Sequence, residues 1–172
     1  YLNHGSFGAC PKPIFKDYQK WQLELESSPV NFMIEKGPIL LKDSRLKLAN
    51  YIGTDVNDIV YTTNPSYAIN IIAKSIDLKL GDEVLTTDLE YGAMDRTWKY
   101  YCNKKRAIYK RQNIQLPINN KEQIVNEFFK GYTDKTKAIF ISHITSTTAL
   151  ILPVREICKK AKELGLITIV DG

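Results

Sequence analysis

Residues 137–172, KAIFISHITSTTALILPVREICKKAKELGLITIVDG, contain the pattern that decides the fold. The stretch begins with an apolar run at residues 137–142 and ends with a second one at residues 166–170. Between them, Pro153 precedes a segment whose apolar residues recur at helical spacing, and Gly165 follows that segment as a stop signal. Two short apolar runs joined by a helix are typical of neighbouring parallel strands, so we expect a parallel sheet.

The same alternation of strands and helices extends toward the N-terminus. We expect further strands at residues 59–62, 83–87 and 107–109, with helices at residues 68–76, 94–101 and 120–129. Asn120, followed three residues later by Gln123, resembles a capping box at the start of the last of these helices. The alternation predicts an α/β fold, with a mostly parallel sheet covered by helices on both faces.

The first part of the chain has a different pattern. A glycine-rich start is expected to be irregular, and helices are expected at about residues 11–26 and 38–52. Pro38 just inside the second helix and Gly53 just past its end fit the usual placement of these two residues. We therefore divide the chain into an irregular and helical segment, residues 1–53, and part of an α/β domain, residues 54–172.

Composition excludes several classes of protein. With 172 residues, 44% of them hydrophobic and 25% charged, the chain has the size and balance of one globular domain. No apolar run is long enough to span a membrane, and no signal peptide is visible. The three cysteines form neither a metal-ligand pattern nor a disulfide framework, which favours a reduced, cytoplasmic setting. The net charge of +5 favours anionic ligands without requiring nucleic acid.

In a parallel sheet, ligands bind beyond the carboxyl ends of the strands, so the residues that follow each strand are the candidate site. Asn64, Pro65 and Ser66 follow the first expected strand and begin a helix. The unsatisfied N–H groups of a helix N-terminus bind phosphate, and the Ser66 hydroxyl can add a donor. The alternative is a plain helix cap without a ligand, which the missing N–H of Pro65 favours.

Three other strand ends carry polar or aromatic residues. Asp171 ends the last strand and could pair with a cationic ring nitrogen, or it could be a solvated loop residue. Tyr91 could stack on a flat ring, although a core tyrosine is the more frequent case. Thr145 and Ser146 could hydrogen-bond to a ligand oxygen, whereas a single histidine such as His143 is more often structural.

A run of basic and aromatic residues, KYYCNKKRAIYKR, covers residues 99–111. Such a mixture occurs in nucleic-acid-binding surfaces. The run extends over the end of a helix, a turn and a short strand, so a solvated face is the favoured interpretation. We expect neither nucleic acid nor a membrane as a partner.

Five segments together resemble a known family. They are YLNHGSFGACP (1–11), DIVYTTNPSYAIN (58–70), LGDEVLTTDLEYGAM (80–94), ISHITSTTALILPV (141–154) and ITIVDG (167–172). In this order and spacing they resemble the class V aminotransferase-fold enzymes, especially the isopenicillin N epimerase-like proteins and the cysteine desulfurases. The resemblance covers essentially the whole chain and implies the large domain of fold type I pyridoxal-phosphate enzymes, incomplete at its C-terminus.

The resemblance also implies a cofactor, pyridoxal 5′-phosphate, and a role for each matching residue. Ser66 contacts the phosphate with help from backbone near Asn64 and Tyr67, Tyr91 stacks on the ring, Thr145 or Ser146 lies near the ring hydroxyl, and Asp171 pairs with the ring nitrogen. The residues expected to face the substrate are Asn3, His4, Gly5 and Ser6. This chain departs from the family at Pro65 and Ser66, where alanine and threonine are usual.

The expected function is therefore that of a pyridoxal-phosphate enzyme acting on an amino acid. Epimerase, desulfurase, lyase and transaminase activities all remain open, and the resemblance implies a homodimer. The Schiff-base lysine of the family lies past the segment that ends at Gly172, so no catalytic residue and no metal ligand is assigned. The alternative is a non-catalytic fragment or a ligand-binding α/β domain; a nucleotide-binding domain of the GxGxxG type does not fit TTNPSYA.

Overall fold

The computed structural model describes residue 4 and residues 8–172, and the chain forms two compact units that divide between Tyr61 and Thr62. The sequence suggested a division after residue 53. Residues 54–61 instead belong to the first unit, where the Arg45 guanidinium donates to the carbonyl of Val56 at 2.6 Å. The assignment of the remaining residues to a cofactor-binding domain stays a prediction.

The first unit is helical among its described residues. The helices α2 (Lys12–Ser27) and α4 (Gly37–Ile52) occupy the two expected segments, and Gly53 ends α4 in the left-handed conformation. Between them lie α3 (Pro29–Asn31) and the π-helix η1 (Phe32–Lys36), which the sequence pattern did not predict. The 3₁₀ turn η2 (Val56–Asp58) follows α4.

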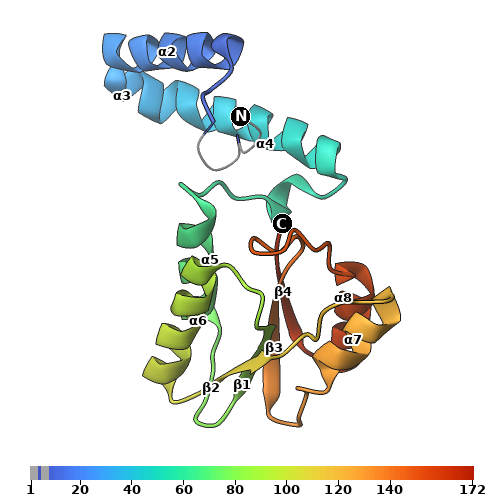
Figure 1. The fold of residues 1–172 in the computed structure, drawn as a ribbon. Coiled ribbons are helices and arrows are strands. Elements are labelled where there is room, and N and C mark those ends of the chain that lie inside the picture. The colour runs from blue at the N-terminus through green and yellow to red at the C-terminus, as the bar shows by residue number, and fades with distance from the viewer. Residues whose placement is uncertain (1–3, 5–7) are drawn as a thin grey trace. The chain divides into compact units, whose positions relative to one another are not determined.

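The second unit contains a four-stranded parallel sheet (Figure 1). Its strands are β1 (Glu83–Thr87), β2 (Ile108–Gln112), β3 (Thr136–Ser142) and β4 (Ile167–Asp171), in the spatial order β2-β1-β3-β4. Every neighbouring pair is parallel. This confirms the parallel sheet expected from the alternation, and β1 has the bounds expected from the sequence.

Helices cover both faces of the sheet. One face packs on α5 (Pro65–Ser75) and α6 (Gly92–Lys105), and the other on α7 (Lys121–Phe129) and α8 (Val154–Glu163). Alternate residues of the central strands supply the two cores: Phe140 belongs to the α5/α6 cluster, and its neighbours Ile139 and Ile141 belong to the α7/α8 cluster. The α/β architecture with helices on both faces is therefore confirmed.

The prediction of a strand at residues 59–62 is wrong. Ile59 has an extended backbone and is buried, but residues 59–62 pair with no strand in the described part of the chain. Val60 is 81% exposed, as suits a residue with no neighbouring strand to cover it. β-branched and aromatic residues favour an extended backbone, but a strand also requires a partner for its hydrogen-bond ladder.

The helix start expected at residue 120 is confirmed. The Asn120 side chain accepts a hydrogen bond from the Gln123 N–H at 2.8 Å, and the Gln123 side chain accepts one from the N–H of Asn119 at 3.0 Å. The first bond satisfies a first-turn donor that the helix itself cannot pair, and the second joins Gln123 to the residue before the cap, one position earlier than in a strict capping box. None of the helices in residues 8–172 is long and apolar enough to cross a bilayer.

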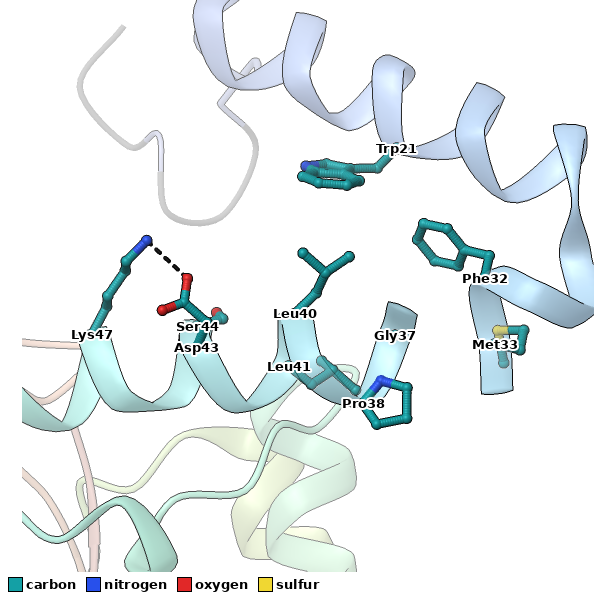
Figure 2. A pocket seen from close by; sticks show the side chains of 10 residues that line it. All are labelled: Trp21, Phe32, Met33, Gly37, Pro38, Leu40, Leu41, Asp43, Ser44 and Lys47. Carbon is teal, nitrogen blue, oxygen red and sulfur yellow. Dashed lines mark ion pairs between the residues drawn. The ribbon is translucent and has the colours of Figure 1, made fainter. Parts of the chain in front are cut away.

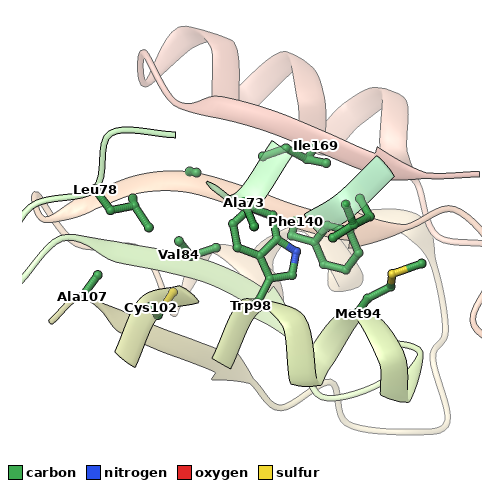
Figure 3. Packing of buried hydrophobic residues seen from close by; sticks show 11 residues of the cluster. Ala73, Leu78, Val84, Met94, Trp98, Cys102, Ala107, Phe140 and Ile169 are labelled. Atoms are coloured by element: carbon green, nitrogen blue, oxygen red, sulfur yellow. The ribbon is translucent and has the colours of Figure 1, made fainter. Parts of the chain in front are cut away.

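Packing of the α5/α6 core predicts a large effect of truncating Phe140. Its side chain is fully buried, and its ring centroid lies 5.7 Å from that of Trp98 (Figure 3). We expect Phe140→Ala to lower the free energy of unfolding in urea by about 3–5 kcal/mol, because it leaves a cavity that the sheet cannot close. The control Leu80→Ala, at a side chain 77% exposed, should change it by less than about 0.5 kcal/mol. Equal losses in the two variants would contradict this packing.

Candidate functional site

The N-terminus of α5 lies at the edge of the sheet where the strands end. Asn70 in α5 donates to the Thr97 hydroxyl in α6 at 3.3 Å, and Lys105 at the end of α6 donates to the carbonyl of Lys74 at 2.9 Å. The middle of α5 thus contacts the middle of α6, and the end of α5 contacts the end of α6, so the two helices run in the same direction. Because α6 begins directly after β1, both helix N-termini lie at the carboxyl edge of the sheet.

Asp171 points to the sheet face that α5 covers. In β4 it lies two residues after Ile169, whose side chain belongs to the α5/α6 core. Side chains alternate along a strand, so Asp171 and Ile169 share one face. Asp171 is half-buried, and this burial raises the pKa of its carboxyl group. A partly desolvated acid therefore lies on the same face and at the same edge as the start of α5.

The start of α5 is a capped helix end. The Asn64 side chain accepts a hydrogen bond from the Tyr67 N–H at 2.8 Å, as the helix-cap alternative predicted. Ser66 is half-buried on the first turn, and its carbonyl accepts a bond from the Asn70 side chain. Its own N–H belongs to the first-turn groups for which the helix has no acceptor. The donors available to an anion are thus centred on Ser66, while the Tyr67 N–H is already paired.

Tyr91 is the N-cap residue of α6, and its side chain is 50% exposed. Tyr91 is therefore a surface residue at the carboxyl edge of the sheet. The alternative interpretation, a tyrosine buried in the core, is wrong. An exposed ring at a helix start is available to stack on a planar ligand.

Glu90, directly before Tyr91, is a buried residue that the sequence analysis did not single out. Its carboxylate accepts hydrogen bonds from the Thr87 hydroxyl at 2.5 Å and from the N–H and hydroxyl of Ser142 at 3.0 and 2.6 Å. Burial raises the pKa of the Glu90 carboxyl group, and these hydrogen bonds oppose the rise. One signal was present in the sequence: an acidic residue placed between the end of a buried strand and a candidate ring-stacking residue.

The two candidates in the loop after β3 differ in their surroundings. Thr145 is 1% exposed; its hydroxyl lies 2.6 Å from that of Thr148 and accepts a bond from the Leu150 N–H at 3.0 Å. Ser146 is exposed. The Thr145 hydroxyl is thus occupied by hydrogen bonds within the loop. Of the two side chains, that of Ser146 is the more accessible to a ligand. His143 is also exposed, and its N–H donates to the carbonyl of Asp171 at 2.7 Å.

Of the residues expected to face a substrate, the structure describes one. Asn3, Gly5 and Ser6 are outside the described residues, and His4 is exposed. Among residue 4 and residues 8–172, no group of histidine, cysteine and acidic side chains could hold a metal ion.

Several cations of the basic run at residues 99–111 serve the fold. Lys105 donates to carbonyls at the end of α5, including that of Ile76, and Arg111 pairs with Asp95 at 3.3 Å. Lys110 lies 3.4 Å from the carboxylate of Glu83. These contacts agree with a structural, solvated surface and give no support to nucleic-acid binding.

A separate pocket lies within the first unit (Figure 2). Trp21 of α2 and Leu40 of α4 point toward one another across it, and Phe32 lies beside them. Its charged lining residues, Asp43 and Lys47, pair with one another at 2.9 Å. The lining is mainly apolar, so the pocket lacks the donors that a phosphate needs.

The raised pKa of Glu90 predicts how stability changes with pH. The ordinary pKa of a glutamate is 4.5, and that of Glu90 is higher in the folded protein. As the pH rises, the unfolded chain therefore loses the Glu90 proton before the folded protein does. The stability that Glu90 contributes is therefore present at low pH and is lost as pH rises through the folded pKa. We expect the stability of Glu90→Gln in urea unfolding, relative to that of the wild type, to increase as the pH is raised above the ordinary pKa of 4.5. A difference that does not change with pH would show that Glu90 titrates normally.

Comparison with known proteins identifies the family. The Aminotransferase class-V family model matches residues 13–172. The chain is 30% identical to isopenicillin N epimerase of Amycolatopsis lactamdurans, over 99% of this chain and 44% of that protein. It is 25% identical to L-cysteine desulfhydrase of Arabidopsis thaliana, over 96% of this chain and 39% of that protein. The chain thus spans less than half the length of these curated relatives.

Solved structures share the fold. C-DES, a cystine C–S lyase, superposes with a TM-score of 0.89 at 22% identity, over 100% of this chain and 46% of that one. In one C-DES structure glycine is covalently linked to the pyridoxal-phosphate cofactor. The cysteine desulfurase CsdA from Escherichia coli superposes with a TM-score of 0.80 at 19% identity, over 100% of this chain and 44% of that one. Since the family match covers nearly the whole chain and the parallel sheet agrees with it, this chain belongs to the class-V aminotransferase family.

Proposed function

We propose that this chain is the cofactor-binding part of a pyridoxal-phosphate-dependent enzyme that acts on an amino acid. The observation that carries the proposal is the common location of Asp171 and the start of α5, on one face and at one edge of the parallel sheet. A helix N-terminus suits a phosphate, and a half-buried carboxylate suits a cationic ring nitrogen. One elongated ligand with an anionic end and a basic ring can use both.

The described residues fit this cofactor. Ser66 offers its hydroxyl and a first-turn N–H to the phosphate, and Tyr91 offers an exposed ring for stacking. The fit is weakest at Pro65, which has no N–H, and at Tyr67, whose N–H is paired with Asn64. Ser66 therefore carries more of the phosphate contact than the rest of this helix tip.

When bound, pyridoxal phosphate supplies an electron sink for bonds at the substrate Cα, and the protein provides binding, orientation and electrostatics. Asp171 holds a proton on the ring nitrogen, because an ionised carboxylate favours the charged form of its partner. Burial raises the pKa of Asp171, and pairing with a cationic ring nitrogen would oppose that rise and favour the ionised carboxylate. Ring and carboxylate thus stabilise one another's charge at an edge that is partly withdrawn from water.

The reaction type of the whole protein stays open between epimerase and desulfurase, lyase or transaminase chemistry. The relatives include an isopenicillin N epimerase and an L-cysteine desulfhydrase, and each is matched over less than half of its length. We propose that the Schiff-base lysine of the family is not among residues 1–172 and that residues 3–6 contact the substrate. A homodimer stays a prediction from the resemblance, and a cytoplasmic location stays a prediction from the pattern of cysteines. The alternative is a ligand-binding α/β domain without the lysine.

Asp171→Asn in the full-length protein tests the proposed charge pair. Turnover should fall roughly ten- to a hundredfold, as expected for the loss of a charge-assisted hydrogen bond worth about 1.5–3 kcal/mol. The visible absorbance of the protein with added pyridoxal phosphate should also shift. The control Asp134→Asn changes an exposed residue in the turn before β3 and should leave both unchanged. Equal turnover in wild type and Asp171→Asn would rule out the assigned role.

Ser66→Ala tests the phosphate site. Removing one hydroxyl donor should weaken pyridoxal-phosphate binding about three- to tenfold, the effect of one hydrogen bond of about 0.5–1.5 kcal/mol. The matched control is Ser75→Ala in the last turn of the same helix, where the hydroxyl donates to the carbonyl of Ile71. Titration of both proteins, monitored by tyrosine and tryptophan fluorescence, gives the two affinities. If both variants bind like the wild type, the phosphate lies elsewhere.

A further inference from the structure

We propose that Glu90 is a positioning residue, which fixes Tyr91 relative to Asp171 by joining the carboxyl ends of the strands. This inference rests on the proposed function, because it concerns residues assigned to the cofactor. One buried carboxylate joins the ends of β1 and β3 at the candidate site, and the sheet ladder joins β3 to β4.

The bridge begins in β1 and crosses to β3. One Glu90 oxygen accepts from the Thr87 hydroxyl, so the residue folds back on the end of its own strand. The other oxygen accepts from both the N–H and the hydroxyl of Ser142, the last residue of β3. Glu90 is only 8% exposed, and bonds to a charged or buried acceptor are stronger than those on a surface. The turn that carries Tyr91 is therefore fastened to β3.

The bridge continues from β3 to β4. Ser142 is paired in register with Asp171, and the next residue, His143, donates its N–H to the carbonyl of Asp171 at 2.7 Å. A displacement of Ser142 thus reaches Asp171 through the sheet ladder. Glu90 touches neither a phosphate nor a ring in this arrangement; its effect on the cofactor is through Tyr91 and Asp171.

A second buried glutamate supplies a matched control at the opposite end of β1. Glu83 is 7% exposed, and its carboxylate accepts from the hydroxyls of Thr133 and Thr136 at 2.7 and 3.2 Å. Like Glu90, it joins β1 to β3 through hydroxyl donors. The two residues differ in location, since Glu83 begins the strand and Glu90 follows its end. They also differ in one charged neighbour, since the Glu83 carboxylate lies 3.4 Å from the Lys110 ammonium group.

The experiment compares Glu90→Ala, Glu83→Ala and Glu90→Gln in the full-length protein. Both alanine variants should lose similar stability in urea. Only Glu90→Ala should weaken pyridoxal-phosphate binding, by about three- to tenfold, the effect of weakening one polar contact. It should also reduce the visible circular dichroism of the bound cofactor, because Tyr91 and Asp171 are no longer held in place. Glu90→Gln keeps an oxygen that can accept a hydrogen bond from Ser142. This variant should bind pyridoxal phosphate with the wild-type affinity and show the wild-type circular dichroism.

Two further measurements keep the test decisive. If Glu90→Ala does not fold, Ser142→Ala removes only the 2.6 Å hydroxyl bond and should give a smaller change in the same direction. Hydrogen exchange without cofactor should rise at residues 87–95 and 141–146 in Glu90→Ala but not in Glu83→Ala. The inference is overturned if the two alanine variants change affinity, dichroism and exchange alike, or if Glu90→Ala changes none of them. Failure of the wild type to bind pyridoxal phosphate would instead refute the proposed function, and exchange alone would then decide whether Glu90 holds the strands.

Discussion

The parallel hydrogen-bond ladder is the constraint on which the rest of this unit depends. Because β1, β3 and β4 run in one direction, their carboxyl ends meet at one edge, and residues distant in sequence become neighbours there. An antiparallel arrangement of the same strands would send Asp171 and Ser142 to opposite edges. The candidate site therefore follows from strand direction before any side chain is considered.

The ladder is held in place by apolar packing on two faces and by polar bridges at both ends. The central strands alternate their apolar side chains between the α5/α6 and α7/α8 cores, which buries the sheet on both sides. Glu83 and Glu90 join β1 to β3 at its two ends, each through the hydroxyls of residues in or next to β3. A buried carboxylate is costly unless it is well hydrogen-bonded, so each bridge favours an arrangement of β1 and β3 that keeps the hydroxyl donors at the carboxylate.

Local signals in the sequence predicted most of the fold. Strand signals located all four strands, although β2 extends to Gln112, past the end expected at residue 109. Asn120 and Gln123 identified a helix start, and Pro153 and Gly165 bounded α8 closely. The error at residues 59–62 arose because a strand is defined by its partner, and composition cannot show whether one is present. The π-helix at Phe32–Lys36 was also missed, since a segment of five residues is too short for a periodic apolar pattern to identify.

The sequence by itself determined the fold class, the family and the residue types at the strand ends, because these depend on periodicity and on short motifs. Tertiary structure decided which of these residues have free side chains. In the folded chain the Tyr67 N–H is paired in a helix cap and the Thr145 hydroxyl is paired within a loop. Tyr91 and Ser146 stay exposed, whereas Glu90 is buried. Glu90 and Ser142 are 52 positions apart in sequence. Only folding brings such residues together, because burial and hydrogen bonding are properties of neighbours in space.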